Sequence, residues 1–152
     1  MTLSKWSLGA LTLSAIIGFI DATYLTVEHY LGLVPPCTLT SGCETVTTSA
    51  YSVVLGVPVA LLGAIFYLVV LALIVALWDT CQERFLRFLA HVTWLGLAAA
   101  IYFTAIQAFV LKAYCQYCLL SALTSTFIFI LTQWMWQNVK KIQSISTEDS
   151  IH

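Results

Sequence analysis

The chain has 152 residues, of which 61% are hydrophobic and only 9% are charged. Soluble domains usually carry about 25% charged residues, so this composition excludes a water-exposed globular surface and indicates an integral membrane protein. The formal net charge of −1 at pH 7, with no basic patch, argues against a nucleic-acid partner. The length suits one domain, and we expect residues 1–152 to form a single membrane domain.

The first long apolar segment follows a short polar lead that contains Lys5. Asp21 is the only charged residue between Trp6 and Val27. A helix needs about 20 residues to cross the hydrocarbon core, and this segment is long enough. It also outlasts the usual apolar region of a signal peptide, about 7–15 residues, and lacks a convincing small-residue cleavage site. We therefore predict a retained span over residues 8–30.

Asp21 is the exceptional residue of this first span, because a carboxylate at membrane depth costs about 2.5–3.5 kcal/mol on insertion scales. Such residues usually face the interior of a bundle. Asp21 is compatible with a proton relay, with a polar contact to a bound ligand, or with a hydrogen bond to another helix. We favour the hydrogen bond, because Asp21 lies only about two turns from Glu28 and the expected outer surface.

The longest segment between two spans, Gly32 to Ser52, carries Cys37 and Cys43. Two consecutive prolines before the first cysteine and a glycine before the second exclude a continuous helix through Cys37. Residues 44–51 are compatible with a short helix on the membrane surface. The five residues between the two cysteines let the sulfurs meet, or let each reach a different partner.

Three further runs without formal charge predict three more spans. Pro58 lies in the first turns of the second span, where its missing N–H is tolerated. A short polar turn with Cys81 separates the second span from the third. The tail, residues 140–152, is polar, and we expect it to be frayed from Gln143 onward. The predicted fold is an all-α, four-helix transmembrane bundle with a cysteine-bearing external loop, and its spans are residues 8–30, 53–78, 88–111 and 116–139.

The basic residues are divided unequally between the two ends of this predicted bundle. With four spans, five of the six Lys and Arg residues share the side of both termini, and only Lys112 lies on the other side. The positive-inside rule places the larger group in the cytoplasm. Cys81 then lies on the cytoplasmic side, where thiols stay reduced. The other four cysteines lie on the opposite, oxidising side: Cys37, Cys43, Cys115 and Cys118.

Cys115 and Cys118 form a Cys-x-x-Cys motif at the start of the fourth apolar run. Residues three apart share a helix face, so the two sulfurs can meet. A helix N-terminus lowers the pKa of a thiol, and the thiolate is the attacking form in disulfide exchange. The motif therefore indicates a redox couple at the membrane surface, although a structural disulfide or half of a metal site would use the same residues.

A mobile loop pair beside a fixed helix pair has the arrangement that an electron relay requires. Disulfide exchange passes through a mixed disulfide, so a loop thiol must travel to a fixed sulfur. The last electron acceptor would be a group that the bundle can hold. In an oxidising compartment a membrane quinone, ubiquinone or menaquinone, is the natural candidate. No residue pattern supports flavin, haem or a nucleotide.

Several segments resemble bacterial homologues of vitamin K epoxide reductase. They are DATYLT at 21–26, GCETVTTSAYS at 42–52, LGVPVALLG at 55–63 and CQYC at 115–118. The resemblance covers the chain up to about Lys140 and includes the order of the cysteines, two in a loop before a late Cys-x-x-Cys. The DsbB family, which also couples disulfides to quinone, has its Cys-x-x-Cys in the first external loop instead.

The resemblance implies a quinone-linked thiol–disulfide oxidoreductase that supports disulfide formation at the periplasmic face of the bacterial inner membrane. Cys37 would exchange with the soluble partner, and Cys43 would attack Cys115. Cys118 would lie beside the quinone ring. Ser49 matches a hydroxyl residue held near that ring.

The resemblance also bears on the ligand and the partner. We expect Tyr117, inside the Cys-x-x-Cys motif, to contact the quinone. Many bacterial members carry a fused thioredoxin-like domain, and because this sequence stops at His152 we expect a separate periplasmic DsbA-like protein as the partner. Vertebrate members place a tyrosine where this sequence has Ala122, which argues against reduction of vitamin K epoxide.

Two other interpretations of the cysteines stay open. Four thiolates can bind zinc tetrahedrally, although the five residues between Cys37 and Cys43 exceed the usual spacing of about two to four. Alternatively, the chain is a non-enzymatic membrane scaffold with structural disulfides. A structural disulfide resists reduction whereas a catalytic one reacts readily, so thiol titration separates the scaffold from the enzyme.

Overall fold

The computed structural model describes residues 5–149 and contains four long helices. Each is long and apolar enough to cross a membrane, so the chain is a multi-pass membrane protein and the predicted four-helix transmembrane bundle is confirmed. The helices are α1 (Lys5–Leu31), α3 (Val59–Thr80), α4 (Glu83–Ala105), which continues as the π-helical segment η2 (Ile106–Leu111), and α5 (Gln116–Asp149).

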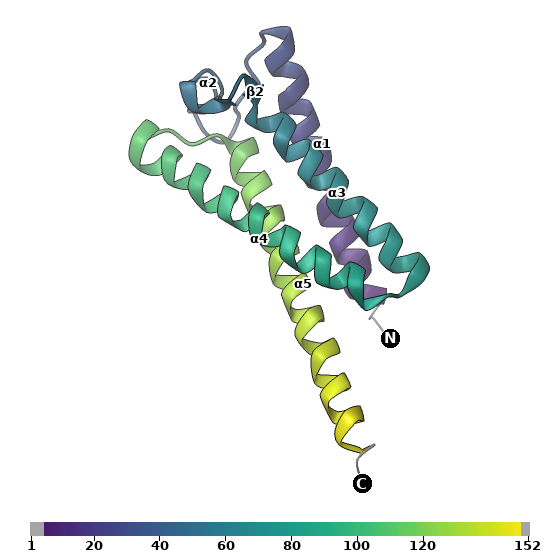
Figure 1. The fold of residues 1–152 in the computed structure, drawn as a ribbon. Helices are drawn as coiled ribbons and strands as arrows, with labels where there is room; N and C mark the ends of the chain where they lie inside the picture. Colours follow the sequence, from purple (N-terminus) through teal and green to yellow (C-terminus); the bar gives the residue numbers. More distant parts are fainter. Residues whose placement is uncertain (1–4, 150–152) are drawn as a thin grey trace.

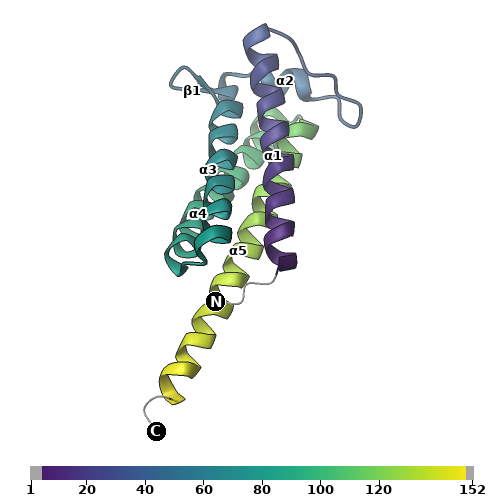
Figure 2. The same cartoon turned by 90° about the vertical axis from the view of Figure 1, so that its right-hand side faces the viewer.

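The helices pack so that α1 contacts α3 and α5, and α4 contacts α5 and α3. The start of α1 and the turn between α3 and α4 lie at one end of the bundle, and the cysteine-bearing loop lies at the other (Figures 1 and 2). The far end of α5 extends beyond the other helices toward the C-terminus (Figure 1). With 34 residues at about 1.5 Å each, α5 is longer than the roughly 30 Å hydrocarbon core.

Close packing in the centre of the bundle depends on one small residue facing one large one. The ring of Tyr67 on α3 is 1% exposed and lies against Gly18 on α1, where any Cβ would overlap the ring. The Tyr67 hydroxyl donates to the carbonyl of Ser121 on α5 at 2.7 Å. Three helices are therefore joined at this level, and a buried hydroxyl is satisfied within the bundle.

The external loop contains two short elements before α3. Helix α2 (Cys43–Thr47) and the 3₁₀ turn η1 (Ala50–Ser52) cover most of the segment that was compatible with a surface helix. The antiparallel hairpin of β1 (Val53–Val54) and β2 (Val57–Pro58) follows. These elements lie over the ends of the long helices (Figure 1), and α2 contacts η2.

The second span begins later than the apolar pattern predicted. Residues 53–58 form the hairpin instead of helix, because valines favour strands and the two turn residues adopt positive φ. The φ angles are 52° at Leu55 and 82° at Gly56, as a tight two-residue hairpin turn requires. Pro58 consequently precedes α3 as its N-cap residue and does not lie within its first turns.

The other predicted boundaries also shift toward longer helices. Helix α4 begins at Glu83, before the predicted start at residue 88, and Glu83 pairs with Arg87 one turn later at 3.5 Å. Helix α5 continues to Asp149, so the prediction of a frayed tail from Gln143 is wrong within the described residues. No glycine or proline interrupts α5, and residues 150–152 lie outside the described part.

Candidate active site

The structure brings Cys37, Cys43, Cys115 and Cys118 together at the loop end of the bundle, as the sequence predicted. Cys37 and Cys43 form a disulfide with their Cα atoms 5.9 Å apart. Cys115 and Cys118 are free thiols, so the structure selects one of the pairings that the sequence left open. Cys81 is exposed in the turn between α3 and α4, at the opposite end (Figure 1).

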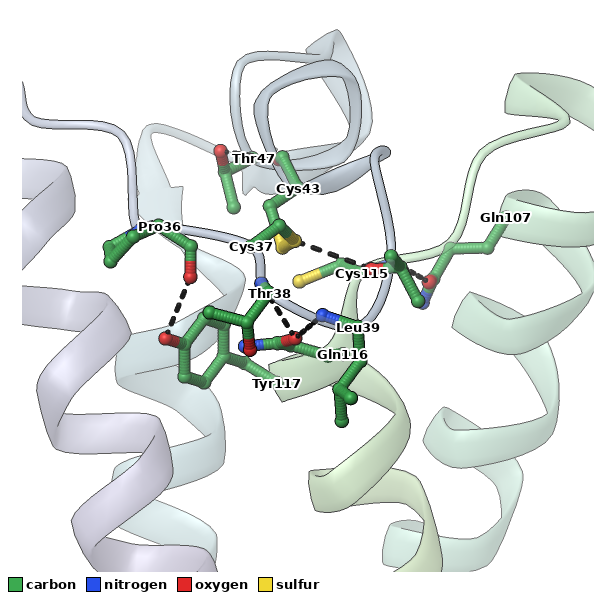
Figure 3. Close-up of a disulfide and its surroundings, with 11 residues drawn as sticks. Pro36, Cys37, Thr38, Leu39, Cys43, Thr47, Gln107, Cys115, Gln116 and Tyr117 are labelled. Atoms are coloured by element: carbon green, nitrogen blue, oxygen red, sulfur yellow. Dashed lines mark hydrogen bonds between the residues drawn. A yellow bond between two sulfur atoms is a disulfide. The ribbon is translucent and has the colours of Figure 1, made fainter.

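The four sulfurs differ in their exposure to solvent. Cys37 is partly buried, whereas Cys43 is 1% exposed and Cys115 is fully buried in the same cluster. The sulfur of Cys115 points toward the Cys37–Cys43 disulfide (Figure 3). Cys118, on the first turn of α5, packs against this cluster. The cysteines thus form a series from the surface of the loop to the mouth of the bundle.

Hydrogen bonds from the start of α5 hold the loop over the inner cysteines. The side-chain oxygen of Gln116 accepts from the backbone N–H groups of Thr38 at 3.2 Å and Leu39 at 2.9 Å (Figure 3). The Tyr117 hydroxyl donates to the carbonyl of Pro36 at 3.0 Å. The two residues inside the Cys-x-x-Cys motif therefore position the loop disulfide. Sequence reasoning missed the role of Gln116, although its polar side chain at this position was a usable signal.

Tyr117, which the sequence predicts to contact a quinone, contacts the loop and another tyrosine in the structure. Its hydroxyl binds the loop, its ring lies 5.4 Å from the ring of Tyr24, and it does not line the cavity described below. In the structure Tyr117 thus contacts the loop, and its contact with a quinone stays a prediction.

Gln107 positions Cys115 from the other side. Its side-chain oxygen accepts from the backbone N–H of Cys115 at 3.0 Å, and the side chain is only 3% exposed (Figure 3). Gln107 lies in the π-helical segment η2, and its own carbonyl accepts from the N–H of Ala113 at 3.1 Å. Single π turns inside helices are frequent at functional sites. Sequence reasoning missed Gln107, whose signal was a lone amide within an apolar run.

A cavity of about 850 Å³ lies between the helices beneath the loop. Ligand pockets usually measure about 300–1,000 Å³ and combine apolar walls with a few polar groups, and this cavity fits both criteria. Cys118 and Ser49, which the sequence predicts to lie near a quinone ring, both lie on its wall. The Ser49 hydroxyl donates to the carbonyl of Val46 at 2.8 Å, so it offers lone pairs to the cavity. Further polar residues on the wall include Asp21, Glu28, His29, Tyr67, Gln107, Ser121 and Ser125.

Asp21 lies on the wall of this cavity with 6% of its surface exposed. Its Oδ2 atom is buried and has no hydrogen-bond partner among residues 5–149. The hydrogen bond to another helix that the sequence favoured is therefore absent at this oxygen. Asp21 therefore lines the cavity while its Oδ2 atom is shielded by protein atoms.

The model of the vitamin K epoxide reductase family matches residues 10–133, which include all four clustered cysteines. The chain belongs to the vitamin K epoxide reductase family. This confirms the resemblance found in the sequence, and the family implies a membrane thiol–disulfide oxidoreductase. No match was found among the curated proteins.

The position of Cys115 in this family member favours its thiolate. A hydrogen bond from the Cys118 thiol is the main cause that lowers the pKa of Cys115 from 9.0 to about 7. Burial opposes the shift, whereas the backbone N–H groups of Cys118 and Tyr117 add to it. Such N–H groups are the unpaired donors of the first turn of α5. Cys115 is thus prepared for disulfide exchange near neutral pH.

We expect the reduced protein to react at Cys115 with a small alkylating reagent at a rate that is half-maximal near pH 7. The reaction slows below this pH because the thiolate, the reactive form, becomes protonated. Labelling of each cysteine is measured by mass spectrometry, with the exposed Cys81 as an internal control for the reagent. In Cys118→Ala the main hydrogen bond is lost, and the midpoint should rise. An unchanged midpoint in that variant contradicts the assignment.

The described residues contain no group of three or more His, Cys, Asp or Glu side chains that could hold a metal ion. The two loop sulfurs are bonded to each other and are not available as separate thiolates. The geometry of residues 5–149 therefore gives no support to the tetracysteine zinc site.

Proposed function

We propose that this protein reoxidises a periplasmic DsbA-like protein of thioredoxin fold and passes the electrons to a membrane quinone. The observation that carries the proposal is the series of cysteines, from the partly exposed Cys37 to Cys118 on the cavity wall. Each cysteine in the series can exchange a disulfide with the next cysteine. The proposed end point is a cavity between membrane-spanning helices, where a lipid-soluble acceptor can enter.

The cysteines have distinct proposed roles. The thiolate of the soluble protein attacks Cys37, the more exposed half of the loop disulfide, and releases Cys43. Cys43 then attacks Cys115 of an oxidised Cys115–Cys118 pair, and the loop disulfide forms again as the soluble protein leaves oxidised. The structure, with an oxidised loop and two inner thiols, corresponds to the stage at which the electrons have reached the inner pair.

The cavity residues fit a quinone. Its walls are mainly apolar, and they also carry Cys118 and several polar side chains, which suits a ring with two carbonyl oxygens. Asp21 lies on the cavity wall, and its buried Oδ2 atom has no hydrogen-bond partner among the described residues. A bound quinone supplies a two-electron acceptor. A DsbA-type carrier is a strong oxidant near about −120 mV, so its reoxidation requires an acceptor of this kind.

The decisive experiment supplies the purified protein with a reduced DsbA-like protein and a short-chain ubiquinone or menaquinone. We expect loss of the carrier's dithiol and reduction of the quinone in equal amounts. Oxidation of the carrier without quinone reduction contradicts the proposal. A loop disulfide that withstands both the carrier and a mild reductant favours the structural scaffold instead.

We also propose that the protein lies in the bacterial inner membrane with both termini in the cytoplasm. Five of the six basic residues fall at the end that contains the N-terminus and the turn between α3 and α4, whereas Lys112 lies beside the cysteine cluster. An alkaline-phosphatase fusion after Lys141 should be inactive, and one in the loop after Gly32 should be active. The reverse pattern contradicts this orientation.

A further inference from the structure

Asp21 carries a buried carboxyl group that the exchange of thiols does not use. The residue lies on α1 with 6% of its surface exposed, beside the buried Ala22, and both line the cavity. A carboxyl group within a membrane span is costly and is usually kept for function. The position of Asp21 on the wall that also carries Cys118 therefore requires an explanation.

Asp21 Oδ2 is one of three buried side-chain atoms without a hydrogen-bond partner in the described chain, with the hydroxyls of Thr23 and Thr132, and it is the carboxylate among them. The nearby cavity residue Tyr67 has its hydroxyl bonded to Ser121 and to the Thr124 hydroxyl, each at 2.7 Å. Asp21 Oδ2 has no partner in the described part of the chain, although it is fully shielded by protein atoms. A buried polar atom without a partner is unfavourable unless something bound supplies one. Asp21 lines the cavity, so a ligand bound there is the candidate partner of its carboxyl group.

The charge of the Asp21 carboxylate would also be felt at the inner thiols. A charge on Asp21 interacts with a charge on Cys115 and with one on Cys118. Cys118 shares the cavity wall with Asp21. A ring that lies against the Cys118 sulfur therefore occupies the cavity whose wall also carries Asp21.

We propose that Asp21 is a further catalytic residue, which donates a proton to the quinone oxygen as the inner cysteines are oxidised. The inference rests on the proposed function. The Cys115 thiolate and the Cys118 thiol give up two electrons and the Cys118 proton as their S–S bond forms. Asp21 gives the second proton, so the quinone receives two electrons and two protons and leaves as the hydroquinone.

The proton count of the full cycle is balanced when Asp21 regains its proton from the outer water. Cys115 releases its own proton to the outer water when it becomes a thiolate, and one proton returns to the Asp21 carboxylate. Glu28 and His29 lie on α1 between Asp21 and the loop and line the same cavity. They provide polar groups along the path between Asp21 and the surface. No net charge then accumulates in the cavity.

The test compares the unchanged protein with Asp21→Asn, which keeps the size of the side chain but cannot exchange a proton. With a reduced DsbA-like protein and a short-chain ubiquinone, we expect quinone reduction to slow about 100-fold, as for the loss of a general acid. Binding of the ubiquinone and exchange of the carrier with Cys37 should stay within about twofold. Infrared spectra should also lose the C=O band of a protonated carboxylic acid.

Two further variants keep the result decisive. Ser14→Ala removes another buried polar side chain of α1, away from the cavity, and should leave the rate unchanged. Asp21→Glu retains a carboxyl group and should recover part of the rate that Asp21→Asn loses. If Asp21→Asn does not fold, Asp21→Glu should still be slower than the unchanged protein and keep a solvent isotope effect.

The outcomes separate this inference from the proposed function. Quinone reduction by Asp21→Asn or Asp21→Glu at the original rate overturns the role of Asp21 and leaves the proposed function standing. A loss of ubiquinone binding as large as the loss of rate also overturns it, because Asp21 would then only hold the ligand. Absence of quinone reduction by the unchanged protein overturns both.

Discussion

Replacing Cys118 with Ala is expected to lower the rate of quinone reduction to the uncatalysed background. The same variant is expected to trap a mixed disulfide between Cys43 and Cys115. Cys118 is the sulfur of the cluster that lies on the cavity wall, and without it Cys115 has no partner for an intramolecular disulfide. Cys43 and Cys115 are both buried in the same cluster, so their sulfurs are the pair prepared to combine.

The trapped species can be identified by mass mapping of the peptides after the free thiols have been blocked. Cys81→Ala is the matched control, because this exposed thiol lies at the other end of the bundle and should affect neither the rate nor the trapping. A peptide that joins Cys37 to Cys115 would reverse the roles of the two loop cysteines. Undiminished quinone reduction by the Cys118 variant would place the terminal step on another group.

Gly42→Ala is expected to separate the loop disulfide from Cys115 and to slow the internal exchange by at least about tenfold. A Cβ at residue 42 would lie 2.6 Å from the Tyr114 nitrogen and 2.8 Å from its carbonyl oxygen. These are backbone atoms next to Cys115 and cannot turn aside as a side chain would. Overpacking of this kind typically costs about 1–3 kcal/mol, and here the loop is the part that can move.

The exchange is measured as the rate at which the Cys43–Cys115 species forms in the Cys118→Ala background. Gly9→Ala is the control, because a Cβ at that position on α1 would meet no atom within 4 Å beyond its chain neighbours and the adjacent backbone of its own helix, and alanine stabilises a helix. Exchange between the soluble carrier and Cys37 should persist in Gly42→Ala, since the loop disulfide itself is retained. An unchanged internal rate would show that the loop tolerates the displacement.

The four spans and the grouping of the cysteines were accessible from the sequence because both depend on local composition. Water cannot satisfy backbone groups inside a bilayer, so long uncharged runs are forced into helices wherever they occur. The order of the cysteines along those runs then places four of them at one end and Cys81 at the other. This reasoning works without knowledge of which helix packs against which.

The boundaries of the elements were less accessible, because apolar residues do not distinguish a strand from a helix over a few positions. The segment 53–58 looked like the first turn of a span, but Leu55 and Gly56 turn it into a hairpin. At the other end, polar residues after Lys141 suggested a frayed tail, although none of them breaks a helix. Composition indicates burial in the membrane, and it does not by itself mark where a helix ends.

Length, charge and the spacing of the cysteines by themselves determined that this is a four-span membrane protein with a thiol centre at one end. The tertiary structure alone decided how that centre is held. Gln116 bonds the backbone of Thr38 and Leu39, and Gln107 bonds that of Cys115. These bonds join segments as many as 78 residues apart, and their partners are backbone groups that look alike in any sequence. The bare oxygen of Asp21 likewise became visible only once the helices had enclosed the cavity around it.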